Sequence, residues 1–155
     1  MNFLTINNYK MKNILIICLA LLFSCTTNSH TAESVPFKVA DNYFVKNTQT
    51  VNIPVEKVIT SKQEFDKIFG TAAHMGKNGM PTAIDFSKEQ VIAIMLPVTG
   101  TSTEIVPVKL VKTHPAEAEF YYKIKSGEKL SYNIKPSVLL IVSKEYKMIR
   151  FNKQD

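Results

Sequence analysis

The stretch "VIAIML", residues 91–96, is a continuous apolar run with the length of one β-strand. A strand that is apolar at every residue, rather than at every second one, is typical of a strand with both faces covered. A second run of this kind, "VLLIV", occupies residues 138–142. We therefore expect two buried strands in the main sheet, each covered on both faces.

Two segments between these runs have the alternating pattern of half-buried strands. In "EIVPVKLVK", residues 104–112, the alternation places three apolar side chains on one face, namely Val106, Val108 and Leu110. Pro107 on the other face indicates a sheet edge or a β-bulge. In "AEFYYKIK", residues 118–125, the alternation predicts an inward face of Phe120, Tyr122 and Ile124 and an outward face of Glu119, Tyr121, Lys123 and Lys125.

The strongest helix signal is "TSKQEFDKIFG", residues 60–70. Ser61 and Glu64 have the spacing of a capping box, which satisfies free amides at a helix N-terminus. The helical period places three apolar side chains on one face, namely Phe65, Ile68 and Phe69. Gly70 follows at a position where helices commonly end in a left-handed residue. We expect a helix of about two turns at 62–69 that docks on a sheet, because so short a helix is marginal alone.

The remaining segments complete a β-rich pattern. Residues 35–59 carry short groups of β-branched and aromatic residues cut by Asn, Asp and Pro, which predicts two or three short strands. Residues 70–83 hold three of the five glycines and predict a long irregular connection. "SKEYKMIRF", residues 143–151, predicts a hairpin that turns near Glu145 and places Ile149 and Phe151 on one face. The expected fold is α+β and mostly β: a curved antiparallel sheet or sandwich with one short helix packed on it, formed by a single monomeric domain at 35–155.

The N-terminal segment has the features of a secretory leader. Ile14 to Phe23 is an apolar run of ten residues preceded by Lys10 and Lys12, whereas a membrane-spanning helix needs roughly 20. Leu22-Phe23-Ser24-Cys25 resembles a bacterial lipobox, in which the cysteine becomes the first residue and carries fatty acyl chains such as palmitate. We expect residues 1–24 to be a lipoprotein signal peptide, with Met1 or Met11 as the start. The alternative, a buried free cysteine ending a helix, fits poorly with the polar residues that follow.

Removal of residues 1–24 would leave 131 of the 155 residues and lower the formal net charge from +6 to +4. The polar stretch "TTNSHTAES" predicts a flexible tether at 25–34. No acidic cluster follows Cys25, so we expect a lipid-anchored protein of the outer membrane that faces the periplasm. Such a weakly basic chain without a recognition motif does not indicate nucleic-acid binding.

Both cysteines, Cys18 and Cys25, are used by the leader and the lipid. We therefore expect no disulfide, thiol nucleophile or cysteine metal site in the mature protein.

Candidate catalytic residues are few and lack partners at motif spacing. His74, and His114 with Glu117 and Glu119 nearby, are the candidates for a metal or acid/base site. Asp85 is a candidate acid, although Asp and Ser in turns usually bind neighbouring backbone. Ser102 lacks the G-x-S-x-G context of a serine nucleophile. We expect no catalytic residue, no metal and no cofactor.

Two connections and one sheet face are candidate recognition sites. The connections 70–83 and 97–104 are rich in small residues, and binding sites often lie in loops on a rigid scaffold; their candidate residues are His74, Met75, Lys77, Asn78, Thr99, Thr101, Ser102 and Thr103. The face carries Tyr121, Lys123 and Tyr132, with Lys125, Lys129 and Lys135 nearby. Such a face suits a protein partner or an acidic glycan, but an ordinary solvated sheet face has the same composition.

A family resemblance rests on four segments in order. They are "EFDKIFG" at 64–70, "PTAIDFSKEQVIAIMLPVTGTSTEIVPVKLV" at 81–111, "FYYKIK" at 120–125 and "IKPSVLLIVSK" at 134–144. Together they resemble the C-terminal domain of PrcB-like proteins, which are exported or lipid-anchored proteins associated with a protease complex. The resemblance spans roughly residues 55–152, and it implies a noncatalytic β-rich domain that binds or stabilises another exported protein. Where that family has a threonine and paired glycines, this chain has "TGTST" at 99–103.

The sequence thus predicts a cell-envelope lipoprotein that acts as a noncatalytic protein-binding or complex-stabilising module, with an envelope protein, such as an exported protease, as the partner. A module that binds a small ligand or a glycan is the first alternative. A small hydrolase using His74, Asp85 or His114 is the second.

Overall fold

A computed structural model of the chain describes residues 33–72 and 79–155. The described chain is mostly β-strand, with one short helix. The predicted leader 1–24, Cys25 and most of the predicted tether lie outside the described residues. The first strand, β1 (Glu33–Ser34), begins two residues before the expected start of the domain at 35. Among the residues that the structure describes, no helix combines the length and apolar composition needed to cross a bilayer.

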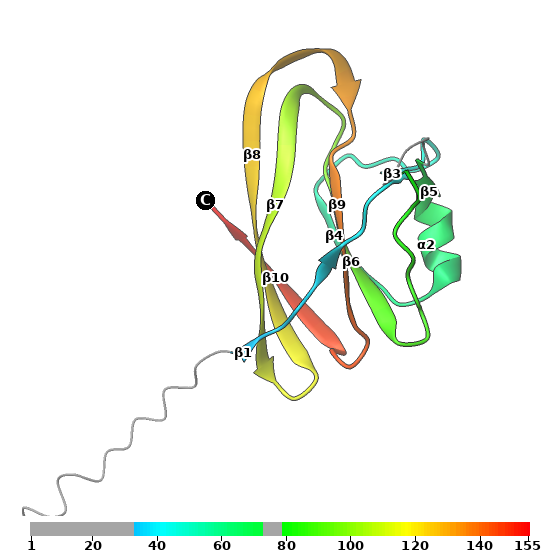
Figure 1. Ribbon diagram of the computed structural model, residues 1–155. Helices are drawn as coiled ribbons and strands as arrows, with labels where there is room; N and C mark the ends of the chain where they lie inside the picture. The colour runs from blue at the N-terminus through cyan, green and yellow to red at the C-terminus, as the bar shows by residue number, and fades with distance from the viewer. Residues whose placement is uncertain (1–32, 73–78) are drawn as a thin grey trace, which may run out of the picture. The chain divides into compact units, whose positions relative to one another are not determined.

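Two four-stranded sheets form a sandwich (Figure 1). The central sheet has the order β2 (Lys38–Val39), β9 (Ser137–Ser143), β6 (Glu89–Met95) and β4 (Val55–Ile59), and all of its pairs are antiparallel. The second sheet, here called the hairpin sheet, has the order β1, β7 (Thr99–His114), β8 (Glu117–Ile134) and β10 (Met148–Gln154). A two-stranded sheet of β3 (Tyr43–Val45) and β5 (Phe69–Thr71) adjoins the helix α2 (Lys62–Ile68).

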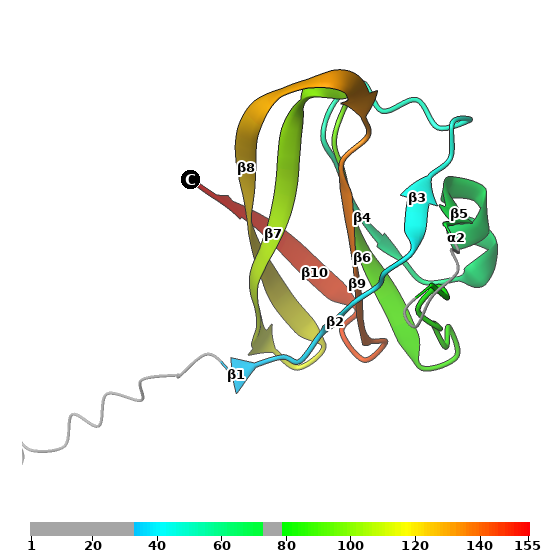
Figure 2. The same cartoon turned by 45° about the horizontal axis from the view of Figure 1, so that its top comes forward.

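The central sheet is covered on both faces, as the two apolar runs predict. Alternate residues of β6 and β9, among them Ile92 and Leu140, pack with Leu110 and Phe120 of the hairpin sheet. The intervening residues, such as Val91, Ala93 and Ile141, pack with Phe65 and Ile68 of α2. Figure 2 shows the hairpin strands on one side of β6 and β9, and α2 with β3 and β5 on the other. Three layers thus enclose two hydrophobic cores.

The helix α2 forms where the sequence predicts it. The Ser61 hydroxyl accepts a hydrogen bond from the backbone N–H of Glu64 at 3.3 Å, so Ser61 is the N-cap. Phe65, Ile68 and Phe69 are all buried. The expected left-handed end at Gly70 is wrong, because the chain passes directly into β5 through an extended Phe69. A Cβ at position 70 would lie 2.7 Å from the Phe44 ring, so this close approach explains the glycine.

Of the expected buried face of Val106, Val108 and Leu110, only Leu110 is buried. A break in the pairing register between Pro107 and Lys109 inserts one residue, and Val108 is 42% exposed. The extra residue shifts the inward face, so Ile105 and Leu110 are the buried pair. The bulge itself lies beside Pro107, where the sequence indicates an edge or a bulge.

The predicted alternation of β8 is correct, since Phe120 and Tyr122 are buried and Ile124 is partly buried against the same core. For the C-terminal segment, the predicted turn near Glu145 and the shared inward face of Ile149 and Phe151 are confirmed, but the predicted hairpin pairing is wrong. After β9 the chain crosses to the hairpin sheet, and β10 pairs in parallel with β8, placing Phe151 beside Phe120. The Gln90 side chain is buried and donates to the carbonyls of Ser143 and Tyr146, at 3.2 and 2.6 Å, which holds the crossing turn.

Candidate functional site

The first predicted recognition connection, 70–83, lies only partly within the described residues. His74, Met75, Lys77 and Asn78 lie outside the described residues. Among the described residues of the same connection, Thr82 is anchored to the segment before β3. Its backbone N–H donates to the Asp41 carbonyl, its hydroxyl accepts from the Asp41 N–H at 3.0 Å, and its carbonyl accepts from the Tyr43 hydroxyl at 2.7 Å.

The second predicted connection, 97–104, is not a loop from residue 99 onward. Thr99, Thr101, Ser102 and Thr103 all belong to β7, where they run beside the second half of β8, residues 126–134. Thr101 pairs with Lys129 and Thr103 with Ser126, with register breaks on both sides of Thr101. The small polar residues therefore form a strand because residues 126–134 of β8 lie beside them and provide cross-strand partners. The small polar composition of residues 99–103 by itself favours a loop, so the sequence prediction was wrong for this segment.

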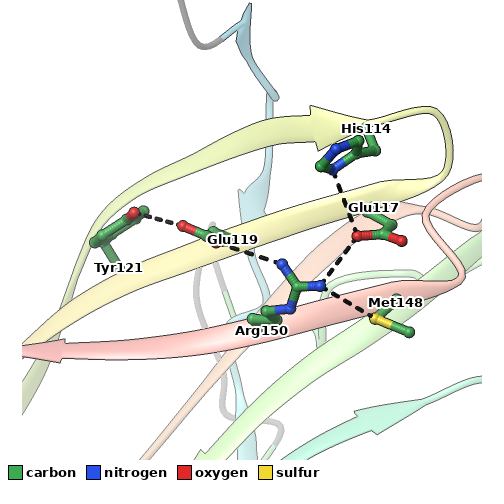
Figure 3. Close-up of polar contacts among 6 residues, drawn as sticks. All are labelled: His114, Glu117, Glu119, Tyr121, Met148 and Arg150. Atoms are coloured by element: carbon green, nitrogen blue, oxygen red, sulfur yellow. Dashed lines mark hydrogen bonds and ion pairs between the residues drawn. The ribbon is translucent and has the colours of Figure 1, made fainter.

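The outward side of the hairpin sheet carries the candidate site, a row of polar side chains across β7, β8 and β10 that we call the hairpin face (Figure 3). The Tyr121 hydroxyl donates to Glu119 at 2.6 Å. The Arg150 guanidinium lies between two carboxylates, 3.7 Å from Glu119 and 3.3 Å from Glu117. The His114 imidazole lies 3.7 Å from Glu117.

Two lysines and a second tyrosine lie on the same two strands, β7 and β8. The Lys109 ammonium lies 4.7 Å from the centre of the Tyr121 ring, a cation–π distance. The Glu119 hydrogen bond, followed by partial burial, raises the pKa of Tyr121, which keeps its hydroxyl protonated and donating. Lys123 donates to the backbone carbonyl of Asp155 at 2.9 Å. Tyr132, farther along β8, is 63% exposed.

This arrangement is suited to binding rather than to proton transfer. Arg150 and Tyr121 occupy the oxygens of Glu117 and Glu119, so neither carboxylate is isolated. His114 is largely exposed beside Glu117. Within residues 33–72 and 79–155, no three His, Cys, Asp or Glu side chains lie close enough to hold a metal ion. The hairpin face presents charges of both signs around the ring of Tyr121.

Asp85 has a structural role in its turn. Its carboxylate accepts from the Ser87 hydroxyl at 2.6 Å and from the Ser87 N–H at 3.0 Å. These hydrogen bonds lower the pKa of Asp85, and the Lys88 charge adds to the effect. The carboxylate thus fixes the entry into β6, as the ordinary behaviour of Asp in turns predicts.

A groove near the end of β9 was not predicted from the sequence. It has a volume of about 480 Å³ and is lined by residues 35–38, 141–143, 145 and 146, together with Lys88 and Glu89. These segments are far apart in the chain, and only the crossing of residues 35–38 between the two sheets brings them together. The sequence signal was therefore limited to the apolar triplet Val35-Pro36-Phe37, which predicts a buried segment but no cavity.

A scan of protein-family models finds no model that matches the chain, and searches of curated proteins and of solved structures find no match.

Proposed function

We propose that this chain is a cell-envelope lipoprotein whose folded unit is a noncatalytic module that binds another exported protein through the hairpin face. The observation that carries the proposal is the row of contacts that runs from Lys109 through Tyr121, Glu119, Arg150 and Glu117 to His114. Ordering side chains at an interface costs entropy, and side chains that already contact one another need less reordering. A PrcB-like resemblance makes an exported protease the first partner class to examine.

The composition of the hairpin face also fits a protein partner. It combines Tyr and Arg, which are enriched at interfaces, with Glu and Lys, which are more common at interface rims. Positive and negative side chains alternate across the three strands. A partner therefore needs charges of the opposite sign at the corresponding positions. Charge complementarity of this kind sets the association rate and the choice of partner more than the affinity.

The binding role is tested by charge reversal on the hairpin face. Lys109→Glu combined with Lys123→Glu should reduce capture of an exported protease partner, and raising the salt concentration should weaken the wild-type complex. The matched control is Lys62→Glu combined with Lys67→Glu on α2, because both are exposed lysines that lie on the opposite side of the central sheet. If the control reduces capture as much as the double variant, the hairpin face is not the binding surface.

The anchor of the proposed lipoprotein is Cys25. Stable attachment needs more than one acyl chain, which a di- or triacylated cysteine provides. Mass spectrometry of the mature N-terminus should find an acylated Cys25, and an unmodified protein that retains residues 1–24 would contradict the anchor. Protease treatment of intact cells should leave the protein whole if it faces the periplasm.

We further propose that the folded unit is monomeric, because the four outer strands of the two large sheets are short or carry charged residues. β1 and β2 have two residues each. On β4, Glu56 is exposed and accepts a hydrogen bond from the Tyr122 hydroxyl. On β10, Lys153 occupies the register position beside buried Tyr122. Short edges and charged residues on edge strands oppose strand addition by another chain, so sedimentation should give a monomer mass.

A second candidate function, small-ligand binding, is favoured by the groove near the end of β9. Its volume of about 480 Å³ lies in the range typical of ligand sites, and most of its lining is apolar. The hydrolase alternative has less support, since Asp85 is occupied by Ser87 and His114 lies beside a neutralised carboxylate.

A further inference from the structure

Met148 adds a thioether to the hairpin face. It is the first residue of β10 and is 50% exposed. Its backbone N–H donates to the Ala116 carbonyl at 3.2 Å, and it pairs with Glu117 of β8 in the parallel register. Met148 and Arg150 are two residues apart on one strand, so their side chains share a face, as Figure 3 shows. The backbone pairing thus holds an accessible thioether next to the Arg150 guanidinium.

The Arg150 guanidinium is held loosely by its neighbours. Its Nη2 atom lies 3.3 Å from a Glu117 oxygen and 3.9 Å from the Met148 Sδ atom. Its Nη1 atom lies 3.7 Å from a Glu119 oxygen. Both distances to oxygen exceed the roughly 2.7–2.9 Å of a strong charge-assisted hydrogen bond, and a thioether sulfur is only a weak acceptor. The guanidinium can therefore respond to a better acceptor at position 148.

We propose that Met148 is an oxidation site whose sulfoxide engages Arg150 and regulates binding through the hairpin face. The oxidant is a peroxide, such as hydrogen peroxide. A lone pair of the sulfur attacks one peroxide oxygen, the O–O bond breaks, and the departing hydroxide takes the proton of the transferred oxygen and leaves as water. The sulfur loses two electrons and the peroxide gains them; a methionine sulfoxide reductase reverses the change. The proposal rests on the proposed function and specifies its regulation.

Oxidation changes the hairpin face in two ways. An exposed apolar side chain becomes polar, whereas methionine itself is a residue type enriched at protein interfaces. The sulfoxide oxygen also gives Arg150 a hydrogen-bond acceptor on its own strand. A guanidinium that turns toward this oxygen leaves Glu117 and Glu119 less neutralised, so the charge pattern that a partner meets is altered.

Two other described methionines provide internal comparisons. Met95 is 4% exposed in the central sheet, so it should react with peroxide much more slowly than Met148. Met80 is 78% exposed and should react readily. Its backbone carbonyl is bound by the Asn42 side chain at 3.0 Å, directly before β3 on the α2 side of the central sheet. Oxidation of Met80 should therefore leave Arg150 unaffected.

The first test needs no partner. The protein is treated with hydrogen peroxide in a Met75→Leu, Met80→Leu background, each remaining methionine is followed by peptide mass spectrometry, and the Arg150 guanidinium is followed by NMR. The Arg150 signals should shift as Met148 is oxidised and return after treatment with methionine sulfoxide reductase. When Met148→Leu is added to this background, peroxide should cause no shift of the Arg150 signals.

The second test measures capture without exposing the partner to peroxide. Met148→Gln places an amide oxygen on a side chain of similar length and imitates the sulfoxide, and Met148→Leu is its apolar match. A photoreactive residue at position 132 reports crosslinking to an exported protein in the native envelope. The crosslink yield should be about two- to fivefold lower for Met148→Gln than for Met148→Leu, the range expected from exposed polar contacts.

Three results would overturn the proposal. The first is oxidation of Met148 that is no faster than oxidation of buried Met95, and the second is Arg150 signals that stay unchanged when Met148 is oxidised. The third is equal capture by the glutamine and leucine variants while Lys109→Glu with Lys123→Glu abolishes capture. That third result would leave the hairpin face as the binding surface, whereas capture that survives the lysine reversal would refute the proposed function itself.

Discussion

The contact between Tyr122 and Glu56 connects the two sheets, and its removal gives a prediction with a specific pH dependence. Tyr122 on β8 is 2% exposed, and its hydroxyl donates to the Glu56 carboxylate on β4 at 2.6 Å. Hydrogen bonds to charged groups contribute about 1.5–3 kcal/mol. Because the Glu56 side chain is itself exposed and can be rehydrated, Tyr122→Phe should lower the free energy of unfolding by about 1–2 kcal/mol at pH 7.

Burial, and then the hydrogen bond to Glu56, raise the pKa of Tyr122 above its ordinary value of 10.0. The folded protein therefore keeps this proton at a pH where the unfolded chain releases it. The stabilisation is complete below pH 10 and falls as the pH rises further, by about 1.4 kcal/mol per pH unit. The difference between wild type and Tyr122→Phe should thus be constant up to about pH 9.5 and shrink above pH 10.

Urea unfolding of both proteins between pH 7 and pH 11.5 measures this difference. Other tyrosines and the lysines titrate in both proteins, so they cancel in the comparison. Glu56→Gln serves as the control, and a double-mutant cycle isolates the coupling between the two side chains. A difference near zero at pH 7, or one that stays constant through pH 11.5, would refute the role of this contact.

Chemical unfolding of four further variants tests the α2 helix, the contact between Gly70 and the Phe44 ring, and the turn between β7 and β8. Phe69→Ala should cost about 3–5 kcal/mol because Phe69 is buried in the core under α2; a change near zero would place the core elsewhere. Ser61→Ala removes the N-cap and should cost about 1 kcal/mol, whereas Ser61→Asp should retain stability. Gly70→Ala should cost about 1 kcal/mol as the partly exposed Phe44 ring moves away, and the cost should disappear in a Phe44→Ala background. Ala116 has a φ of 64° in the β7–β8 turn, so Ala116→Gly should stabilise the protein by about 1 kcal/mol; destabilisation would show that the turn is not strained.

The elements predicted well from the sequence are those determined by local chemistry. The α2 helix follows from a capping serine and three apolar residues within one short segment. The runs at 91–96 and 138–142 indicate coverage on both faces because each residue is apolar, and the structure confirms this with one core on either side. The alternation of β8 has the same local basis.

The errors arise where distant segments determine the outcome. A bulge at Val108 changes which residues face inward, and its position depends on the partner strand β8. The pairing of β10 with β8 in parallel cannot be inferred from "SKEYKMIRF", because a short turn favours the neighbouring strand β9. The polar segment at 99–103 forms a strand only because 126–134 lies beside it. Of the candidate site, Tyr121 and Lys123 are predicted from alternation, but Arg150 enters the hairpin face only through the unexpected position of β10.

Site-specific photo-crosslinking in the native envelope tests the central claim most directly. A photoreactive amino acid replaces exposed Tyr132 or exposed Lys109 in one pair of proteins, and Lys67 on the far side of the central sheet in the control. The proposed function predicts a crosslink to one and the same exported protein from both positions on β7 and β8, and none from position 67. Crosslinks that are absent from positions 109 and 132, or equally strong from position 67, would contradict binding through the hairpin face.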